Sequence, residues 1–276
     1  MGSGELTGKT AIVTGGSRGL GRAMALGLAR AGASVVVTAA RDCSALEAVA
    51  IEAETGCGTG SVRAVQADVT IEGDCQRVAE EAIHLFGAIH ILVNNAGRGM
   101  RFVSERFFDT PTKFWETSPA SWRMIVDTNV NGPFLMTRAV VPCMLRQGWG
   151  RIINISMNHQ TMRRPGFSPY GPSKAALESE TIIWAQDLAG TGVTVNSLLP
   201  GGASRTGMIP DDLPLEARRS LLDPAIMVPP LLWLASPAAD VVTGARFVAS
   251  RWDPALPPGK AAEAASAPAG WMVPAP

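Results

Sequence analysis

Tyr170 and Lys174 are the residues whose types and spacing most directly suggest chemistry. Tyr170 is the only tyrosine in the 276-residue chain. A spacing of four residues places both side chains on one face of a helix. A phenol has an ordinary pKa of about 10 and is a poor base near neutral pH, but a nearby ammonium group lowers that pKa by favouring the phenolate. The pair therefore predicts a proton donor or acceptor at Tyr170.

A glycine-rich turn between an expected strand, Thr10–Thr14, and an expected helix, Gly19–Ala31, is the second chemical feature. Glycines let the backbone approach a pyrophosphate closely, and the positive end of the helix dipole faces the phosphates. The turn favours a dinucleotide, although such a turn can also serve only as a tight connection. The candidate binding residues in this turn are Gly15, Ser17, Arg18, Gly19, Leu20 and Gly21.

Two arginines bear on which dinucleotide would bind. An acidic residue after the second strand accepts hydrogen bonds from a free ribose 2′-hydroxyl, whereas arginine favours a 2′-phosphate. Arg18 lies in the glycine turn and Arg41 follows the second expected strand, which favours NADP. Asp42 is close enough to serve a ribose if the loop is registered differently, so NAD remains the alternative.

The elements that must position these residues alternate between short β-branched runs and longer amphipathic stretches, and strands such as Ile91-Leu92-Val93 read as unbroken apolar runs. This pattern predicts an α/β fold with a doubly wound, Rossmann-like parallel sheet and ligands at the carboxyl ends of its strands. The expected strands are Thr10–Thr14, Ser34–Thr38, Val62–Gln66, Ile89–Val93, Arg151–Ile155 and Val193–Ser197. The expected helices are Gly19–Ala31, Cys43–Glu54, Gly73–Phe86, Pro119–Leu145 and Ser168–Ala189.

We expect a single catalytic domain over residues 1–252. Two long loops interrupt the alternation, at 98–118 and 201–223, and loops of this length are usually functional. Residues 253–276 form a Pro- and Ala-rich tail that we expect to be extended or partly disordered.

Composition excludes several classes of protein. Lys plus Arg and Asp plus Glu both number 24, so nothing suggests a nucleic-acid surface. No apolar run is long enough to span a membrane, and no leader segment is evident, so we expect a cytoplasmic protein. Neither a disulfide framework nor a metal site is expected from the spacing of Cys43, Cys57, Cys75, Cys143, His84, His90 and His159.

The ordered motifs resemble those of the short-chain dehydrogenase/reductase family from about Lys9 to Val248. The glycine spacing Gly15-x3-Gly19-x-Gly21 is similar to the TGxxxGxG of that family, and Tyr170-x3-Lys174 to its YxxxK. The resemblance implies that Tyr170 protonates a carbonyl oxygen as hydride arrives, and that Lys174 also holds the nicotinamide ribose. It implies that Asn129 anchors a water in a proton relay, although an Asn within a helix often bonds nearby backbone instead. Further cofactor-binding residues implied by the resemblance are Asp68, Val69, Asn95, Ala96, Gly97, Pro200 and Gly201, together with Tyr170 and Lys174 themselves.

The chain departs from the family at its catalytic serine. Family members usually place a serine thirteen residues before the tyrosine to polarise the substrate carbonyl, and that position is Met157 here. Ser156 is one residue early and would point to the opposite face of an extended strand unless a bulge shifts the register. Either Ser156 is re-aimed and becomes the fourth catalytic residue, or Asn158, His159 or a water replaces it, or carbonyl chemistry is weakened.

These observations predict an NADP-dependent oxidoreductase that transfers a hydride to or from an alcohol or carbonyl substrate. One alternative is a dinucleotide-binding regulatory or scaffolding protein with little turnover, because of Met157. Another is a non-redox net reaction, such as an epimerisation through a transient ketone. The resemblance also implies a homodimer or homotetramer built on the helices around 119–145 and 168–189.

The substrate region is expected to combine apolar and cationic side chains. Aromatic residues of the 98–118 loop could line an apolar pocket or form the buried side of the loop. Arginines flank the same region, so a carboxylate or phosphate on the substrate is compatible with it, although solvated arginines explain them equally well. The aromatic residues are Phe102, Phe107, Phe108, Phe114 and Trp115, and the arginines are Arg98, Arg101, Arg106, Arg163 and Arg164.

Overall fold

The computed structural model describes residues 5–56, 60–210 and 214–270, so part of the 201–223 loop and the end of the tail lie outside the described residues. Within these residues eight strands form one sheet in the order β3-β2-β1-β4-β5-β6-β7-β8. All neighbouring pairs are parallel except β7 and β8. The strands are β1 (Thr10–Thr14), β2 (Ser34–Ala39), β3 (Val62–Gln66), β4 (Ile91–Asn94), β5 (Gly150–Ile155), β6 (Val193–Leu199), β7 (Ala245–Val248) and β8 (Ser266–Pro268).

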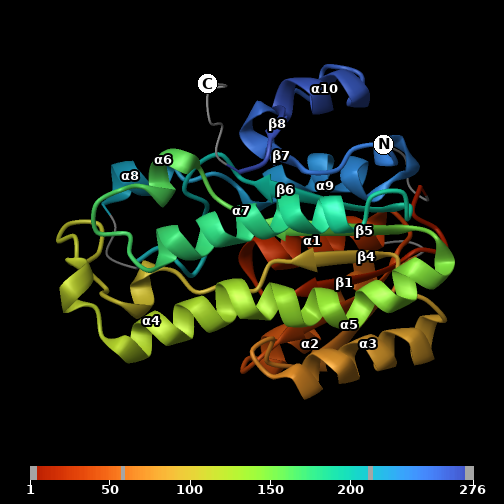
Figure 1. The fold of residues 1–276 in the computed structure, drawn as a ribbon, viewed down its shortest axis with the longest axis horizontal. Coiled ribbons are helices and arrows are strands. Elements are labelled where there is room, and N and C mark those ends of the chain that lie inside the picture. The colour runs from red at the N-terminus through yellow and green to blue at the C-terminus, as the bar shows by residue number, and fades with distance from the viewer. Residues whose placement is uncertain (1–4, 57–59, 211–213, 271–276) are drawn as a thin grey trace.

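Helices cover both faces of the sheet, as the unbroken apolar runs of β1, β2 and β4 require. Buried side chains of α1, α2 and α9 form one core cluster, and those of α3, α5 and α7 belong to the other. Figure 1 shows α5 and α7 crossing the sheet, with α4, α6 and α8 together at its left end. The α-helices are α1 (Gly19–Arg30), α2 (Cys43–Gly56), α3 (Glu72–Phe86), α4 (Pro119–Val126), α5 (Gly132–Gln147), α6 (His159–Met162), α7 (Tyr170–Asp187), α8 (Leu215–Arg219), α9 (Val228–Ala235) and α10 (Pro258–Ala265).

The expected doubly wound sheet is confirmed, and the predicted elements agree with the observed ones to within two residues except in one region. The continuous helix expected over Pro119–Leu145 is wrong. It is divided by a π-helical turn, η3 (Asp127–Asn131), between α4 and α5. Gly132 and Pro133 follow the turn, and Pro133 has no N–H to continue the regular ladder of hydrogen bonds.

The expectation of an extended tail is also wrong for much of its length. Residues 258–265 form α10, and residues 266–268 form β8, which pairs antiparallel with β7. The prolines lie where they are tolerated, because Pro258 begins the helix and Pro268 lies on an edge strand. Between them Ala261, Ala262 and Ala265 are buried, so the alanine-rich run supplies a helix face rather than a linker.

No helix in the described ranges combines the length and the apolar character needed to cross a membrane.

Candidate active site

Helix α7 begins at Tyr170 and carries both residues of the expected catalytic pair. Tyr170 is half-buried, and the side chain of Lys174 is buried one turn later. Lys174 Nζ donates a hydrogen bond to the carbonyl oxygen of Ile155 at the end of β5, at 2.7 Å. Helix α7 is thereby fixed to the carboxyl end of a central strand, where a doubly wound sheet binds its ligands.

Burial sets the direction of the Tyr170 pKa, whereas the lowering expected from the ammonium group together with a cationic nicotinamide stays a prediction. Burial raises the pKa of Tyr170 to about 12. Burial also lowers the pKa of Lys174 to about 8, against opposing contributions from Glu178 and Glu180. Desolvation outweighs the effect of the ammonium group because Lys174 is directed to a backbone oxygen and is itself withdrawn from water. The phenol is therefore protonated at neutral pH.

The buried Lys174 predicts a pH-dependent contribution to stability. Its pKa is about 8 in the folded chain and 10.5 otherwise, so the unfolded chain binds more protons between these values and stability rises with pH across that window. Relative to a Lys174→Met variant, the free energy of unfolding of the wild type should increase by about 2 kcal/mol between pH 7 and 9.5. Urea unfolding of both proteins measures this, and a difference independent of pH would contradict it.

Asn129 is fully buried in the π-helical turn η3. Its Oδ1 accepts the Arg98 N–H at 2.8 Å, and its Nδ2 donates to Arg98 O and to Ser173 Oγ, each at 2.9 Å. Asn129 therefore joins the loop after β4 to the first turn of α7, between Tyr170 and Lys174. The bonds to nearby backbone expected as the alternative are present, and the water relay stays a prediction.

The glycine turn is attached to the end of β4 by two side chains. Asn95 Nδ2 donates to Thr14 O at 2.8 Å and to Gly15 O at 3.0 Å. Thr14 Oγ1 accepts the N–H groups of Asn95 and Ala96, both at 3.0 Å. A Cβ on Gly21 would lie 2.3 Å from Gly15 O, so no other residue fits there. Thr14 did not stand out in the sequence, because its role depends on the pairing of β1 with β4.

The loop after β6 closes over the same turn. Gly19 has a φ of +55°, and a Cβ there would lie 3.0 Å from Thr206 Cγ2. Gly207 lies beside the guanidinium group of Arg18, which is exposed. The turn thus has glycine where the backbone needs positive φ and close approach, and it presents Arg18 to solvent at its mouth. These features fit the residues to a dinucleotide. Ser17 and Leu20 are partly buried beside them.

The remaining residues implied for the cofactor lie at loop positions after successive strands. Asp68 Oδ1 accepts bonds from the Thr70 N–H and hydroxyl, and buried Val69 packs at Gly132. Gly97 faces Asn129, and Pro200 O accepts the Ser250 N–H. Gly97 thus lies against η3, and Pro200 lies at the end of β6 beside the segment after β7, while the binding of all these residues to one dinucleotide stays a prediction.

The two residues that distinguish the dinucleotides have different surroundings. Arg41 is exposed, and its charge helps to lower the pKa of Arg98 after the larger effect of burial. Arg98 therefore lies near Arg41, although the sequence assigned it to the substrate region. Asp42 Oδ1 accepts the Ala45 N–H at 3.2 Å, so this carboxylate caps the start of α2.

At the serine position, Met157 lies in the apolar cluster against which Tyr170 packs. Ser156 is buried, its N–H bonds to Leu198 O, and its hydroxyl has no hydrogen-bond partner among the described residues. Asn158 Nδ2 donates to Gly201 O at 2.9 Å. Burial and the charge of Arg246 lower the pKa of His159, with Glu178 opposing. None of these contacts places Ser156, Asn158 or His159, the candidates for the missing serine, against Tyr170.

The aromatic residues of the long loop divide between core and pocket. Phe107 is buried in the cluster that includes Met157 and Tyr170, whereas Phe114 and Trp115 are 68% and 69% exposed. A pocket lies between residues 111–115 and residues 162–168, and Arg163 and Arg164 are among the residues that line it. The loop therefore contributes Phe107 to the core and residues 111–115 to this pocket, and a role of the pocket in binding substrate stays a prediction.

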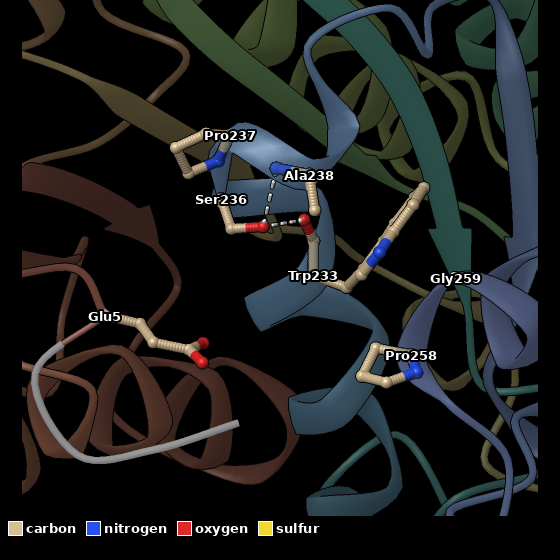
Figure 2. Close-up of a pocket in the computed structure, with 7 residues that line it drawn as sticks. All are labelled: Glu5, Trp233, Ser236, Pro237, Ala238, Pro258 and Gly259. Carbon is tan, nitrogen blue, oxygen red and sulfur yellow. Dashed lines mark hydrogen bonds between the residues drawn. The ribbon is translucent and has the colours of Figure 1, made fainter.

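A second pocket lies away from these motifs, between the end of α9 and the start of α10 (Figure 2). Ser236 Oγ donates to Trp233 O and accepts the Ala238 N–H beside it. Glu5 is its only ionisable lining residue among those described, and no residue of the catalytic or glycine motifs lines it. It is lined by Glu5, Trp233, Ser236, Pro237, Ala238, Pro258 and Gly259.

A buried polar network that the sequence did not reveal aligns the strands beneath the site. Asn94 on β4 donates to Asn154 on β5 at 2.9 Å, and Asn154 donates to Thr181 on α7 at 2.9 Å. The Thr181 and Ser197 hydroxyls lie 3.2 Å apart, which extends the network to β6. Each of these four side chains is at most 2% exposed, so the network depends on satisfied bonds in the interior.

Together, the doubly wound sheet, the glycine turn and the Tyr-Lys helix at the same end define a dinucleotide-binding α/β oxidoreductase. A family model described as short chain dehydrogenase matches residues 9–213, and the chain belongs to this family.

The chain is 40% identical over 200 residues to a "Short-chain type dehydrogenase/reductase" of Picea abies, covering 71% of each chain. It is 32% identical to "Glucose 1-dehydrogenase 2" of Bacillus subtilis, covering 87% of this chain and 93% of the relative. A solved dehydrogenase/reductase from Sinorhizobium meliloti is 34% identical with a TM-score of 0.77, covering 88% of this chain and 94% of that one. Relatives named as enzymes do not favour the scaffolding alternative.

Proposed function

We propose that this oxidoreductase is NADP-dependent and interconverts an alcohol and a carbonyl compound, with Tyr170 as general acid and base. The observation that carries the proposal is the arrangement on α7, where Tyr170 lies one turn from Lys174, whose ammonium group is fixed by Ile155 O. The test is turnover of NADPH with a panel of ketones and aldehydes, followed by the absorbance of the reduced nicotinamide. Tight cofactor binding without turnover on any of them would overturn the proposal.

The steps follow from the protonation states of this chain. When bound, the nicotinamide supplies or accepts the hydride. Tyr170, protonated because burial raises its pKa, donates its proton to the carbonyl oxygen of the substrate. Lys174 remains anchored to β5 and binds ribose hydroxyls, and Asn129 keeps the first turn of α7 in register with the loop after β4. Alcohol oxidation requires the phenolate, so its rate should rise with pH.

The preference for NADP rests on Arg18 and Arg41. Both are exposed near the glycine turn, where guanidinium groups bind a phosphate through paired hydrogen bonds. Asp42, the acid that would serve a free ribose, is engaged in capping α2. A relative 38% identical, from Synechocystis sp., is named "3-oxoacyl-[acyl-carrier-protein] reductase", and substrates of this general kind, with an oxo group to reduce, are compatible with the proposal.

Replacing Arg41 with Ala should raise the KM for NADPH by about 10- to 100-fold, because a charge-assisted phosphate contact is lost. The kinetic constants for NADH should stay unchanged. Arg30→Ala, at an exposed position in the last turn of α1, is the matched control for loss of one surface arginine. Steady-state kinetics with both cofactors measure the effect. Equal changes for NADPH and NADH, or a wild type that prefers NADH, would contradict the assignment.

We further propose a cytoplasmic homodimer or homotetramer. Helices α4, α5 and α7, which the family resemblance assigns to subunit contacts, carry large exposed apolar side chains, among them Trp122, Phe134 and Ile183 at 42%, 48% and 51% exposure. Apolar patches of this kind often mark an interface. A sharp monomer in light scattering at micromolar concentration would remove this part of the proposal.

A further inference from the structure

Arg246 and Glu178 form a buried ion pair that the mechanism above does not use. Arg246 lies on β7, and Glu178 lies on α7, one turn after Lys174. Arg246 Nε is 3.5 Å from Glu178 Oε2, and the two side chains are 8% and 1% exposed. Burying two charges costs several kcal/mol per ion, so a buried pair is weak evidence of a purely stabilising role. The hydrogen bonds that Arg246 and Glu178 make to other groups therefore indicate what the pair does.

Arg246 connects the ion pair to the backbone segment that carries Met157. Arg246 Nη2 donates to Met157 O at 2.8 Å, and Lys174 Nζ donates to Ile155 O at 2.7 Å. Ile155 and Met157 are two residues apart, so two buried cations bind carbonyl oxygens of one short segment at the end of β5. Ser156 N–H, between them, bonds to Leu198 O of β6. This backbone is therefore restrained from both sides where it meets Tyr170.

The C-terminal segment contacts Glu178, the acidic member of the ion pair. Gly270 N–H donates to Glu178 Oε2 at 3.0 Å. Ala267 of β8 pairs with Arg246 of β7, which covers the strand that presents the guanidinium group. The family model ends at residue 213, so these contacts belong to a part of the chain outside the matched region.

We propose that Arg246, held by Glu178 and the C-terminal segment, is a positioning residue that fixes the Met157 backbone beside Tyr170 during reduction. This inference rests on the proposed function. Arg246 acts through Met157 O, and Glu178 acts through Arg246.

The experiment compares Arg246→Met, Glu178→Gln and the double variant with the wild type. Each single variant leaves a buried charge without its partner and should lower both Tm and kcat. The double variant removes both charges, so its Tm should return toward that of the wild type. Its kcat should remain about 10- to 100-fold low, because Met157 O has lost its donor and small misplacements at a reacting centre are costly. The KM for NADPH should not change.

Hydrogen exchange supplies a readout independent of turnover. Amides of residues 156–162 should exchange faster in the double variant, at equal global stability, than in the wild type or in Glu263→Gln. The latter breaks the exposed Lys260–Glu263 pair of α10 and controls for charge loss in the C-terminal segment. Recovery of kcat together with Tm, or unchanged exchange in residues 156–162, would overturn the inference. A wild type that turns over no substrate would instead overturn the proposed function, and exchange would still test the positioning role.

Discussion

Replacing Tyr170 with Phe should reduce kcat by about a thousand-fold, because general acid catalysis by a positioned side chain contributes a factor of that order. The phenylalanine ring keeps the apolar contacts that Tyr170 makes in its cluster and removes only the hydroxyl group. Tyr170 is the only tyrosine in the chain, so no second phenol can take its place. Single-turnover reduction of a substrate by NADPH would measure the chemical step directly.

The control for this variant is cofactor binding. The dissociation constant for NADP, measured by calorimetry, should change little in Tyr170→Phe, because the contacts of the glycine turn lie on other elements. A variant that binds NADP normally and still reduces substrates at the wild-type rate would show that another group supplies the proton.

Replacing Met157 with Ser should raise kcat/KM for simple ketones by up to about 100-fold, the effect of one preorganised donor to a developing oxyanion. Met157 occupies the family's serine position, and it packs in the same cluster as Tyr170, so a hydroxyl group there would face the reacting region. The buried hydroxyl of Ser156 has no hydrogen-bond partner among the described residues. Steady-state reduction of a ketone panel measures the gain.

Met157→Ala is the matched control, because it opens the same space without adding a hydroxyl group. The alanine variant should show no gain, and it should lose stability through the cavity it leaves. Equal gains in both variants would show that room for the substrate, rather than a missing donor, limits the wild type. No gain in either would indicate that the chain already supplies a donor from elsewhere.

Much of the fold followed from local patterns. The unbroken apolar runs in Ser34–Ala39 and Ile91–Asn94 indicated strands covered on both sides, and both lie within the parallel sheet. The prediction of one continuous helix around 119–145 was wrong because a repeating apolar pattern does not reveal a single inserted residue. The π-helical turn at Asp127–Asn131 accommodates such a residue. The prediction of an extended tail was wrong because composition alone does not say whether prolines lie inside helices and strands or at their ends.

The candidate site was predictable where a motif is continuous in the chain. The spacing of Tyr170 and Lys174 fixed their common helix face. The direction of the Tyr170 pKa was not predictable, because it depends on how completely the loop segments around Phe107 and Phe167 cover the ring. The interaction of the Arg98 charge with Arg41 and Asp68 was likewise not predictable, because these residues come from different loops.

The sequence by itself determined the alternation of the main strands and helices up to β6, the glycine turn and the spacing of Tyr170 and Lys174, since these depend on neighbours within a few residues, whereas β7, α10 and β8 were not predicted. Only the tertiary structure decided which group each reactive side chain meets. Lys174 Nζ donates a hydrogen bond to Ile155 O of β5, and Arg246 Nη2 of β7 donates one to Met157 O. The Gly270 N–H of the C-terminal segment donates one to Glu178 Oε2. These partners lie 19, 89 and 92 positions apart, and burial in a shared interior, rather than any local pattern, sets their charges and hydrogen bonds.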